Sequence, residues 1–502
     1  MGRLTIGHTV DDTGLERLLA PRDDIVGECR LDDGSFGLAH GPFTSYHRSV
    51  VVEDLPDGQH RVTETYRFAL AVLAWNVLYS PLVKRALRTR STNARQPWWA
   101  PPDRLDAATT RTIAMLSLLM IVTGYIGTLM SQTITFAADE FGNDKGAQGI
   151  TLATVRLGNL VTLALAVMAD RRGRRPLLLG ASFGACAFAG LGAISTGLWT
   201  LGGSQATARG LATAMSIIIG IMAAEAAPRN SRAYLASVLT LSAGFGSFLA
   251  VAALPLADLG DRGWRLLYAI ALAGLPVAAY VSANLVESSR FVEAKQKAAV
   301  PRVSLRSSRF ALIALTGFLT AIFVAPASQF QNEFLRDERG FSAVDISVFT
   351  ITSNLLVIVG LAVGGRLADS RGRRGVAAFA LAVGATLVVM RYAQDGWSMW
   401  AWSIAGSLVA AMAVPALSVY SAELFGTGDR GRANGWSTII AVTGSASGLL
   451  LVGFLSDSFG SFAPAFAITL AGPLLVSVLV FTRFPETAHA ELEDLNPQDR
   501  AS

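Results

Sequence analysis

Long apolar segments recur along most of the chain and constrain its fold more than any other feature of the sequence. They cover residues 113–138, 147–169, 176–199, 203–227, 232–256, 264–286, 310–332, 342–368, 375–394, 398–422, 434–456 and 462–483. A membrane-spanning helix needs about 20 predominantly apolar residues, and a helix satisfies its own backbone hydrogen bonds in lipid. We therefore predict an all-α polytopic membrane protein with twelve transmembrane helices, whose main partner is the lipid bilayer.

The composition agrees with residence in lipid and excludes soluble and disordered classes. Hydrophobic residues make up 52% of the 502 residues and charged residues only 16%, whereas soluble domains carry about 25% charged residues. Assigning the loops alternately to the two sides of the membrane places most loop arginines on one side, which the positive-inside rule makes cytoplasmic. We expect a plasma-membrane protein with both termini in the cytoplasm and no nucleic-acid partner, despite the net charge of +5.

Cysteine and histidine are too few, or wrongly placed, for metal or redox chemistry. The two cysteines, Cys29 and Cys186, exclude a disulfide framework and a four-thiolate metal site. All five histidines fall outside the apolar segments. The sequence contains no ATP-binding GxxxxGK[ST] motif and no cluster of nucleophile, base and orienting group. We expect no metal, no cofactor, no catalytic residues and no enzymatic activity.

Residues 1–95 precede the membrane segments and are expected to form a small cytoplasmic α+β extension. They begin without the apolar core of a signal peptide. Two weakly alternating stretches flank Pro56-Asp57-Gly58, a pattern typical of a hairpin turn. The segment 68–87, interrupted by Pro81, is predicted to be an interfacial helix, and the tryptophan-containing linker 96–112 an interface anchor.

The stretch from GPFTSYHRS through the hairpin to that helix resembles the C-terminal part of START-like helix-grip domains. The resemblance covers less than half of such a fold, so a closed ligand cavity is not implied. Two roles for the extension stay open: a structural cap, or a ligand-sensing or partner-binding module.

The chain carries an internal duplication. Asp170-Arg171-Arg172-Gly173-Arg174-Arg175 closes the second segment, and Asp369-Ser370-Arg371-Gly372-Arg373-Arg374 closes the eighth, a shift of 199 residues. Asp258 and Asp457, and also Gln132 and Gln331, repeat at the same shift. We predict two six-helix bundles, residues 113–287 and 309–487, joined by a cytoplasmic linker 288–308 and followed by a tail 488–502. In such architectures the substrate site lies near the midplane between the halves.

With these loops in both halves, the sequence resembles the major facilitator superfamily over about residues 110–490. EAAPRNSR (225–232), its counterpart ELFGTGDR (423–430), VESSR (286–290) and PET (485–487) resemble the marks of metabolite and sugar porters. Ala166 and Gly426 replace the usual Gly and Pro of these signatures. The seventh segment, with APASQFQNEF, lacks the sugar-porter pattern, and the fifth lacks the Gly-Pro motif of drug antiporters.

The resemblance implies a cytoplasmic latch between the two halves. An aspartate at a helix end can accept hydrogen bonds from a neighbouring helix N-terminus, and the arginines can pair with the glutamates of the porter motifs. The expected latch residues are Asp170, Arg171, Gly173, Arg174, Arg175, Glu225, Arg232, Asp369, Gly372, Arg373, Arg374, Glu423 and Arg430. The alternative is that these charges only set the membrane topology.

Arg156 and Arg209 lie inside predicted spans, where a cation facing lipid is costly. They either form structural pairs or read an anionic substrate such as a carboxylate. The other expected cavity residues are Tyr125, Thr128, Gln132, Gln329, Gln331 and Asn354. For each of these the alternative is an ordinary interhelical hydrogen bond.

The function predicted from these features is secondary transport of a small organic solute, an anionic metabolite, by alternating access in a monomer. The resemblance implies coupling to protons, for which the candidate groups are Asp139, Glu140 and Glu333; the alternative is a uniporter or exchanger. Two alternatives stay open: a drug or xenobiotic efflux carrier, and a non-transporting membrane sensor or scaffold that works through the N-terminal extension.

Overall fold

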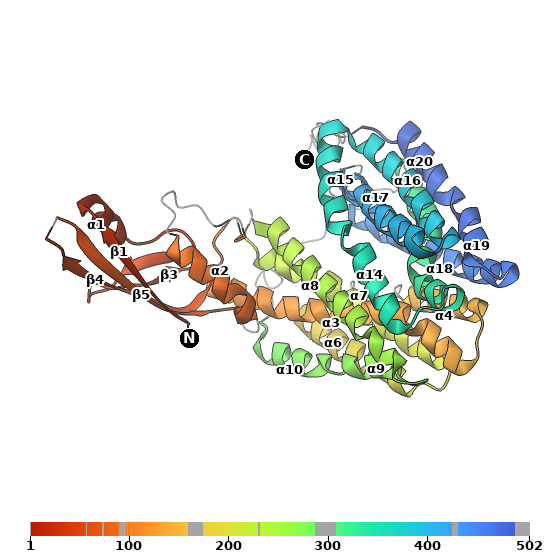
Figure 1. Cartoon of the computed structure of the whole chain (residues 1–502), viewed down its shortest axis with the longest axis horizontal. Coiled ribbons are helices and arrows are strands. Elements are labelled where there is room, and N and C mark those ends of the chain that lie inside the picture. Colours follow the sequence, from red (N-terminus) through yellow and green to blue (C-terminus); the bar gives the residue numbers. More distant parts are fainter. Residues whose placement is uncertain are drawn as a thin grey trace, which may run out of the picture. The chain divides into compact units, whose positions relative to one another are not determined.

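The computed structural model describes residues 2–56, 58–72, 75–89, 97, 99–101, 103–158, 174–228, 231–286, 308–423 and 430–486 (Figure 1). The chain divides into two compact units. The first contains Met1–Ile121, Ser216–Gly244 and Val277–Glu293, and the second contains Val122–Met215, Phe245–Pro276 and Ala294–Ser502. The first unit therefore holds the N-terminal extension and parts of four helices, and the second holds most of the membrane helices.

The extension is built on a five-stranded antiparallel sheet with strand order β1-β5-β4-β3-β2. Its elements are β1 Gly2–Val10, α1 Asp12–Leu19, β2 Gly27–Arg30, β3 Phe36–His40, β4 Phe43–Asp54, β5 His60–Leu70 and α2 Asn76–Arg88. The predicted hairpin is confirmed, since β4 pairs with β5 from Asp54 and His60 inward. Gly58 turns the chain there in the left-handed region, with φ of 68°, which glycine adopts without steric cost.

The interfacial helix predicted over 68–87 begins later, at Asn76. Phe68 and Leu70 belong to strand β5, where they are buried. A short apolar run fits a strand or a helix equally well by pattern. Here pairing of β5 with both β1 and β4 decides for the strand.

A buried ionic network lies at the centre of the extension. Arg48 is fully buried and binds the carboxylates of Glu28 and Glu64, each at 2.7 Å. The hydroxyl of Tyr46 donates to Glu28 at 2.6 Å. Burial raises the pKa of Tyr46, and the negative charge of Glu28 acts in the same direction. Burial also raises the pKa of the neighbouring Tyr66 to about 12, so both phenols stay neutral; the hydroxyl of Tyr66 accepts from Arg22 at 2.9 Å.

The rest of the chain is helical. Its elements are α3 Ala107–Phe141, α4 Lys145–Gly158, α6 Arg174–Gly190, η2 Leu191–Ile194, α7 Leu198–Ala226, α8 Arg232–Ala253, η4 Leu254–Asp258, α9 Arg265–Ala271, α10 Gly274–Asn284, α12 Ser308–Gln329, α13 Gln331–Glu333, η5 Phe334–Glu338, α14 Ala343–Asn354, α15 Val357–Arg371, α16 Arg373–Ala393, α17 Gly396–Glu423, α18 Arg430–Phe459, α19 Phe462–Thr469 and α20 Ala471–Arg483. Eleven helices within the described ranges are long and apolar enough to cross a membrane. The second predicted span, 147–169, is described only in its first half, as α4. The predicted multi-pass all-α body is thus confirmed.

Within the second unit, small residues bring helices of the two predicted bundles close together. Helix α4 of the first bundle packs on α18 of the second. A Cβ atom added at Gly149 of α4 would lie 2.8 Å from the carbonyl oxygen of Leu449 and 3.4 Å from the Cα of Gly453. Because no side chain fits in this gap, the two backbones approach as small residues allow in membrane helix packing.

Replacing Arg48 with Met should destabilise the extension, because Glu28 and Glu64 would keep buried charges without a counterion. Removing one member of a buried ionic group costs about 3–5 kcal/mol, equivalent to at least about a hundredfold change in an opening equilibrium. We expect hydrogen exchange of the β4 and β5 amides to accelerate accordingly, as measured by mass spectrometry of the full chain. Arg61→Met is the control, since its pair with Glu53 spans 3.8 Å and is solvent-exposed. Equal protection of β4 and β5 in both variants would show that the network contributes little.

Candidate functional site

Two arginines of the second unit carry charge inside the helical body. Arg156 is near the C-terminal end of α4 and Arg209 is in the middle of α7. The Nη1 of Arg209 donates to the carbonyl oxygen of Gly127 on α3 at 2.8 Å. Arg156 has neither an ion pair nor a hydrogen bond with any described residue, and its charge acts on Arg209. The structure therefore brings together two cations that repel each other and have no carboxylate partner within the described part of the chain.

The polar residues predicted on the first span lie on α3, and their side chains have partners. Tyr125 donates its hydroxyl to the carbonyl of Leu267 at 2.8 Å, and Thr128 bonds to a carbonyl of its own helix, that of Gly124. Gln132 accepts a hydrogen bond from the amide of Asn332 at 3.0 Å. Of the three, Gln132 alone contacts the second predicted bundle through these bonds.

Of the polar residues predicted on the seventh and eighth spans, Gln331 binds a third arginine that the sequence reasoning missed. Arg391 of α16 is buried and donates to Gln331 at 2.8 Å and to the carbonyl of Ala327 at 3.0 Å. Gln331 in turn donates to Thr350 at 3.0 Å. Gln329 is buried, and Asn354 bonds to a carbonyl of its own helix. Because Arg391 is the only charge between Arg374 and Asp395, its position in the apolar segment 375–394 was the available signal.

Asp258 and Asp457, which repeat in the sequence, make equivalent contacts in the structure. Asp258, at the end of η4, accepts hydrogen bonds from the first backbone amides of α14, those of Ala343 and Val344 at 3.1 and 3.3 Å. Asp457 does the same for α4 through the amides of Lys145 and Gly146. Each aspartate thus places a negative charge at a helix N-terminus that belongs to the other predicted bundle.

These contacts lie at what we call the outer end, formed by the C-terminus of α3 and the N-termini of α4 and α14. Two ion pairs add to them: Arg336 with Asp139 at 2.7 Å, and Lys145 with Asp337 at 2.6 Å. Every one of these contacts joins residues of the first predicted bundle to residues of the second. The outer end is therefore closed.

The three predicted coupling acids lie at or near this outer end in different surroundings. Asp139 is paired with Arg336. Glu140 accepts hydrogen bonds from Trp264 and Arg265 at 2.8 and 2.9 Å. Glu333, which lies beyond the span Phe310–Gln329, is 6% exposed and has no ion pair among the described residues.

The surroundings of Glu333 favour its neutral form. Burial raises the pKa of Glu333; its neighbours Thr135 and Gln148 oppose this, whereas the charges of Asp139 and Asp337 raise it further. The net shift is upward. One carboxyl oxygen, Oε2, has no hydrogen-bond partner in the described ranges of the chain.

Only part of the predicted latch falls within the described residues. Asp170, Arg171 and Gly173 lie outside them, as do the side chains of Arg232, Asp369, Glu423 and Arg430. Arg174 and Arg175 begin α6, and Glu225 lies near the end of α7. In the second loop, Gly372 has φ of 100°, and Glu486 of the PET mark accepts from the amides of Arg373 and Arg374 at 2.9 and 3.2 Å. The latch stays a prediction.

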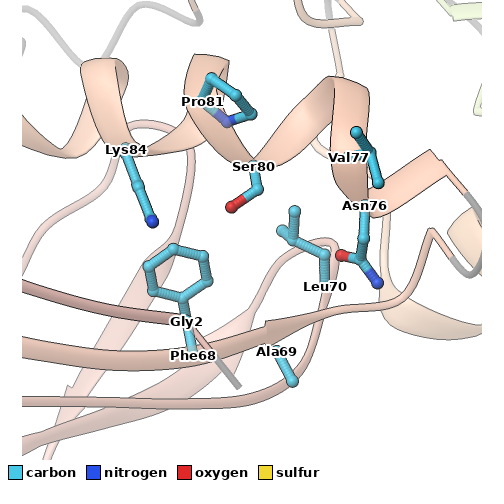
Figure 2. A pocket seen from close by; sticks show the side chains of 9 residues that line it. All are labelled: Gly2, Phe68, Ala69, Leu70, Asn76, Val77, Ser80, Pro81 and Lys84. Atoms are coloured by element: carbon cyan, nitrogen blue, oxygen red, sulfur yellow. The ribbon is translucent and has the colours of Figure 1, made fainter.

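The extension contacts membrane helices within the first unit. Tyr79 of α2 shares a hydrogen bond with Tyr234 of α8, whose hydroxyl donates to the carbonyl of Trp99 at 2.7 Å. The indole of Trp75 donates to the carbonyl of Ala114 on α3 at 3.4 Å. A groove of about 680 Å³ also lies between α2 and the sheet; Figure 2 shows Ser80 and Lys84 directed toward β5.

Cofactor and metal binding find no support in the described part of the chain. It contains no group of three or more His, Cys, Asp or Glu side chains placed to hold a metal ion. Its two cysteines are both free thiols; Cys29 is exposed and Cys186 is buried.

Comparison with known proteins gives one family. The family model for the Major Facilitator Superfamily matches residues 113–403 and 328–499, whereas no curated protein sequence matches the chain. The inward open xylose transporter XylE from E. coli has a TM-score of 0.66 at 14% identity, over 78% of this chain and 99% of that one. An inward-facing, unoccupied bacterial homolog of the human lysosomal transporter Spinster has a TM-score of 0.63 at 13% identity, over 78% and 98%. The nucleoside transporter NupG scores 0.64 at 11% identity, over 74% and 100%. At these identities the likeness shows the fold alone.

Replacing Asp457 with Ala should loosen the outer end, because α4 would lose the acceptor for its first amides. Losing such a cap costs about 0.5–2 kcal/mol, so the fraction of open molecules should rise roughly 2- to 30-fold. A single cysteine at Thr128, in a chain without Cys29 and Cys186, reports this as faster labelling by a membrane-impermeant maleimide added outside. Asp261→Ala, in the exposed loop after η4, is the control. Labelling equal to that of the control would contradict a closing role for Asp457.

Proposed function

The chain belongs to the major facilitator superfamily, whose members are membrane transporters and not enzymes, and on this premise we propose that it is a secondary carrier of a small anionic metabolite. The solute would cross by alternating access, coupled to protons. We further propose that the carrier works as a monomer in the plasma membrane. Both of its termini would lie in the cytoplasm, since loop arginines gather on that side of the predicted topology.

The proposal of an anionic substrate rests on the pair Arg156 and Arg209. A cation in the membrane interior is costly unless it is solvated or neutralised, and two adjacent guanidinium groups add mutual repulsion. A carboxylate or phosphate between them would remove both penalties, because guanidinium donors match the oxygens of these anions in pairs. The same arrangement disfavours the cationic amphipathic compounds that many drug efflux carriers expel.

The closed outer end supports alternating access about this site. Asp258 and Asp457 make equivalent contacts from the two bundles, as expected when two repeats rock against each other around a central site. Breaking these contacts would open the outer end while the predicted cytoplasmic latch forms. The substrate site would then face one side of the membrane at a time.

The test is a thermal-shift screen of the purified protein against small carboxylates, phosphate esters, sugars and cationic drugs. A ligand that binds the folded state raises the melting temperature by mass action, and we expect anions to do so. Arg209→Ala should weaken the binding of the stabilising anion by at least about 30-fold, the effect of truncating one partner of a buried charge pair. Uptake of that anion into proteoliposomes should be lost.

Two variants control this experiment. Arg209→Lys keeps the charge without the planar fork and should retain part of the binding. Arg262→Ala removes an exposed arginine of the outer loop and should leave uptake unchanged. Stabilisation by sugars or cations in place of anions, or full uptake by Arg209→Ala, would refute the assignment of the substrate site.

A further inference from the structure

We propose that Glu333 is the site at which the coupling proton binds, and that its protonation holds the outer end closed. The proposal rests on the carrier function inferred above. It adds a specific group and a specific conformational step to that function.

The position of Glu333 is the first observation. It lies on α13 of the second bundle, with Thr135 of α3 and Gln148 of α4 as polar neighbours from the first bundle. All three side chains are almost completely buried, at 6%, 1% and 1% exposure. The preceding residue, Asn332, donates to Gln132 of α3. Glu333 is thus part of the contact between the bundles, not a group beside it.

The second observation is that Glu333 has no compensating cation. Burying an ionised carboxylate without a counterion is costly, and the group takes up a proton instead. The partners on hand, Thr135 and Gln148, are neutral. Of the unsatisfied atoms Glu333 Oε2, Thr135 Oγ1 and Gln148 Oε1, only the hydroxyl of Thr135 carries a proton. A proton on the carboxyl of Glu333 would add a second donor to this cluster of acceptors.

The charged groups around Glu333 do not replace that cation. On α3, Asp139 is paired with Arg336 of η5, and on α4, Lys145 is paired with Asp337 of η5. Each nearby cation therefore already has its own carboxylate.

More distant charges from the adjoining helices have partners as well. From α16, Arg391 binds Gln331 and a backbone carbonyl. From α18, Asp457 is held by the first amides of α4. From η5, Glu338 accepts from the amide of Phe462 at 2.7 Å. Among the described acids of this region, Glu333 is therefore the one whose negative charge has neither a cation nor a helix N-terminus to balance it.

Burial in the closed state couples the proton to the conformation. When the outer end opens, water reaches Glu333 and the cost of ionising it falls. The carboxyl thus has a higher pKa in the closed state than in the open one, so closure is favoured at pH values below both and is lost as the pH rises through the closed-state value. Acid on the outside therefore closes the outer end behind an entering solute, which is the direction of symport.

The experiment follows the outer end itself by maleimide labelling of the cysteine at Thr128, in proteoliposomes over a range of external pH and without substrate. Each labelling rate is divided by that of the same protein denatured at the same pH, because the thiolate is the reactive form and its fraction rises with pH. In the otherwise unchanged carrier this normalised labelling rate should rise with pH, by up to about tenfold per pH unit for one linked proton. Glu333→Gln, which mimics the protonated acid, should label slowly at every pH. Glu333→Asp should keep a pH dependence, which shows that a titrating group at this position suffices.

Asp139→Asn is the matched comparison, since it removes a paired acid from the same region. It should retain the pH-dependent labelling. If the labelling rate of Glu333→Gln still depended on pH, the assignment to Glu333 would be overturned. The same holds if the pH dependence disappeared in Asp139→Asn alone. Labelling that responds to Na⁺ at constant pH, and not to pH, would overturn proton binding.

The substrate measurements keep this proposal separate from the carrier function. Uptake of an anion by the unchanged protein, together with pH-independent labelling, would refute the proton site and leave the carrier intact. Absence of uptake with pH-dependent labelling that Glu333→Gln abolishes would refute the carrier and leave the proton site intact.

Discussion

Hydrocarbon offers no hydrogen bonds, and every polar group in the membrane body of this protein must find its partner in the chain itself. Backbone groups do so by forming helices. Side chains do so in pairs: Tyr125 with a carbonyl of α9, Gln132 with Asn332, and Arg391 with Gln331. Against this background, groups without such partners carry the most information. Among the described residues Arg156 and Glu333 both lack a counterion, and these two positions support the proposals for the solute and for the proton.

The duplication explains why the outer end closes as it does. Asp258 and Asp457 occupy equivalent positions in the two repeats, and each caps the N-terminus of a helix in the opposite bundle. An acid at a helix N-terminus is favourable at short range and weak enough to be exchanged, which suits a contact that must form and break. The repeat is not kept everywhere. Gln132 contacts the other bundle, whereas the equivalent Gln331 binds Arg391 of its own bundle, so the two halves differ at this repeated pair.

Much of the membrane body could be predicted from the sequence, because apolar length and loop charge are local properties. The spans, the loop arginines and the Asp258/Asp457 repeat are read directly from residue order. The extension is harder to predict: the apolar run that includes Phe68 and Leu70 fits a helix by its pattern, whereas the pairing of β5 with β1 and β4 makes it a strand. The candidate site was predicted as a set of residue types in spans. The partners of those residues, such as Leu267 for Tyr125 or Trp264 for Glu140, lie more than a hundred positions away and carry no local signal.

The sequence by itself determined that this chain crosses a membrane many times, that it consists of two related halves, and that it belongs among the transporters its motifs resemble. These conclusions need only the chemistry of lipid, which acts on each segment separately. The tertiary structure alone decided which charged groups are neutralised. Asp139, Glu140 and Glu333 are equivalent candidates in the sequence. Arg336 and Arg265 pair with the first two, whereas Glu333 has the neutral side chains of Thr135 and Gln148 as neighbours and no cation among the described residues. Electrostatic energy depends on distance and burial in space, and separation along the chain specifies neither.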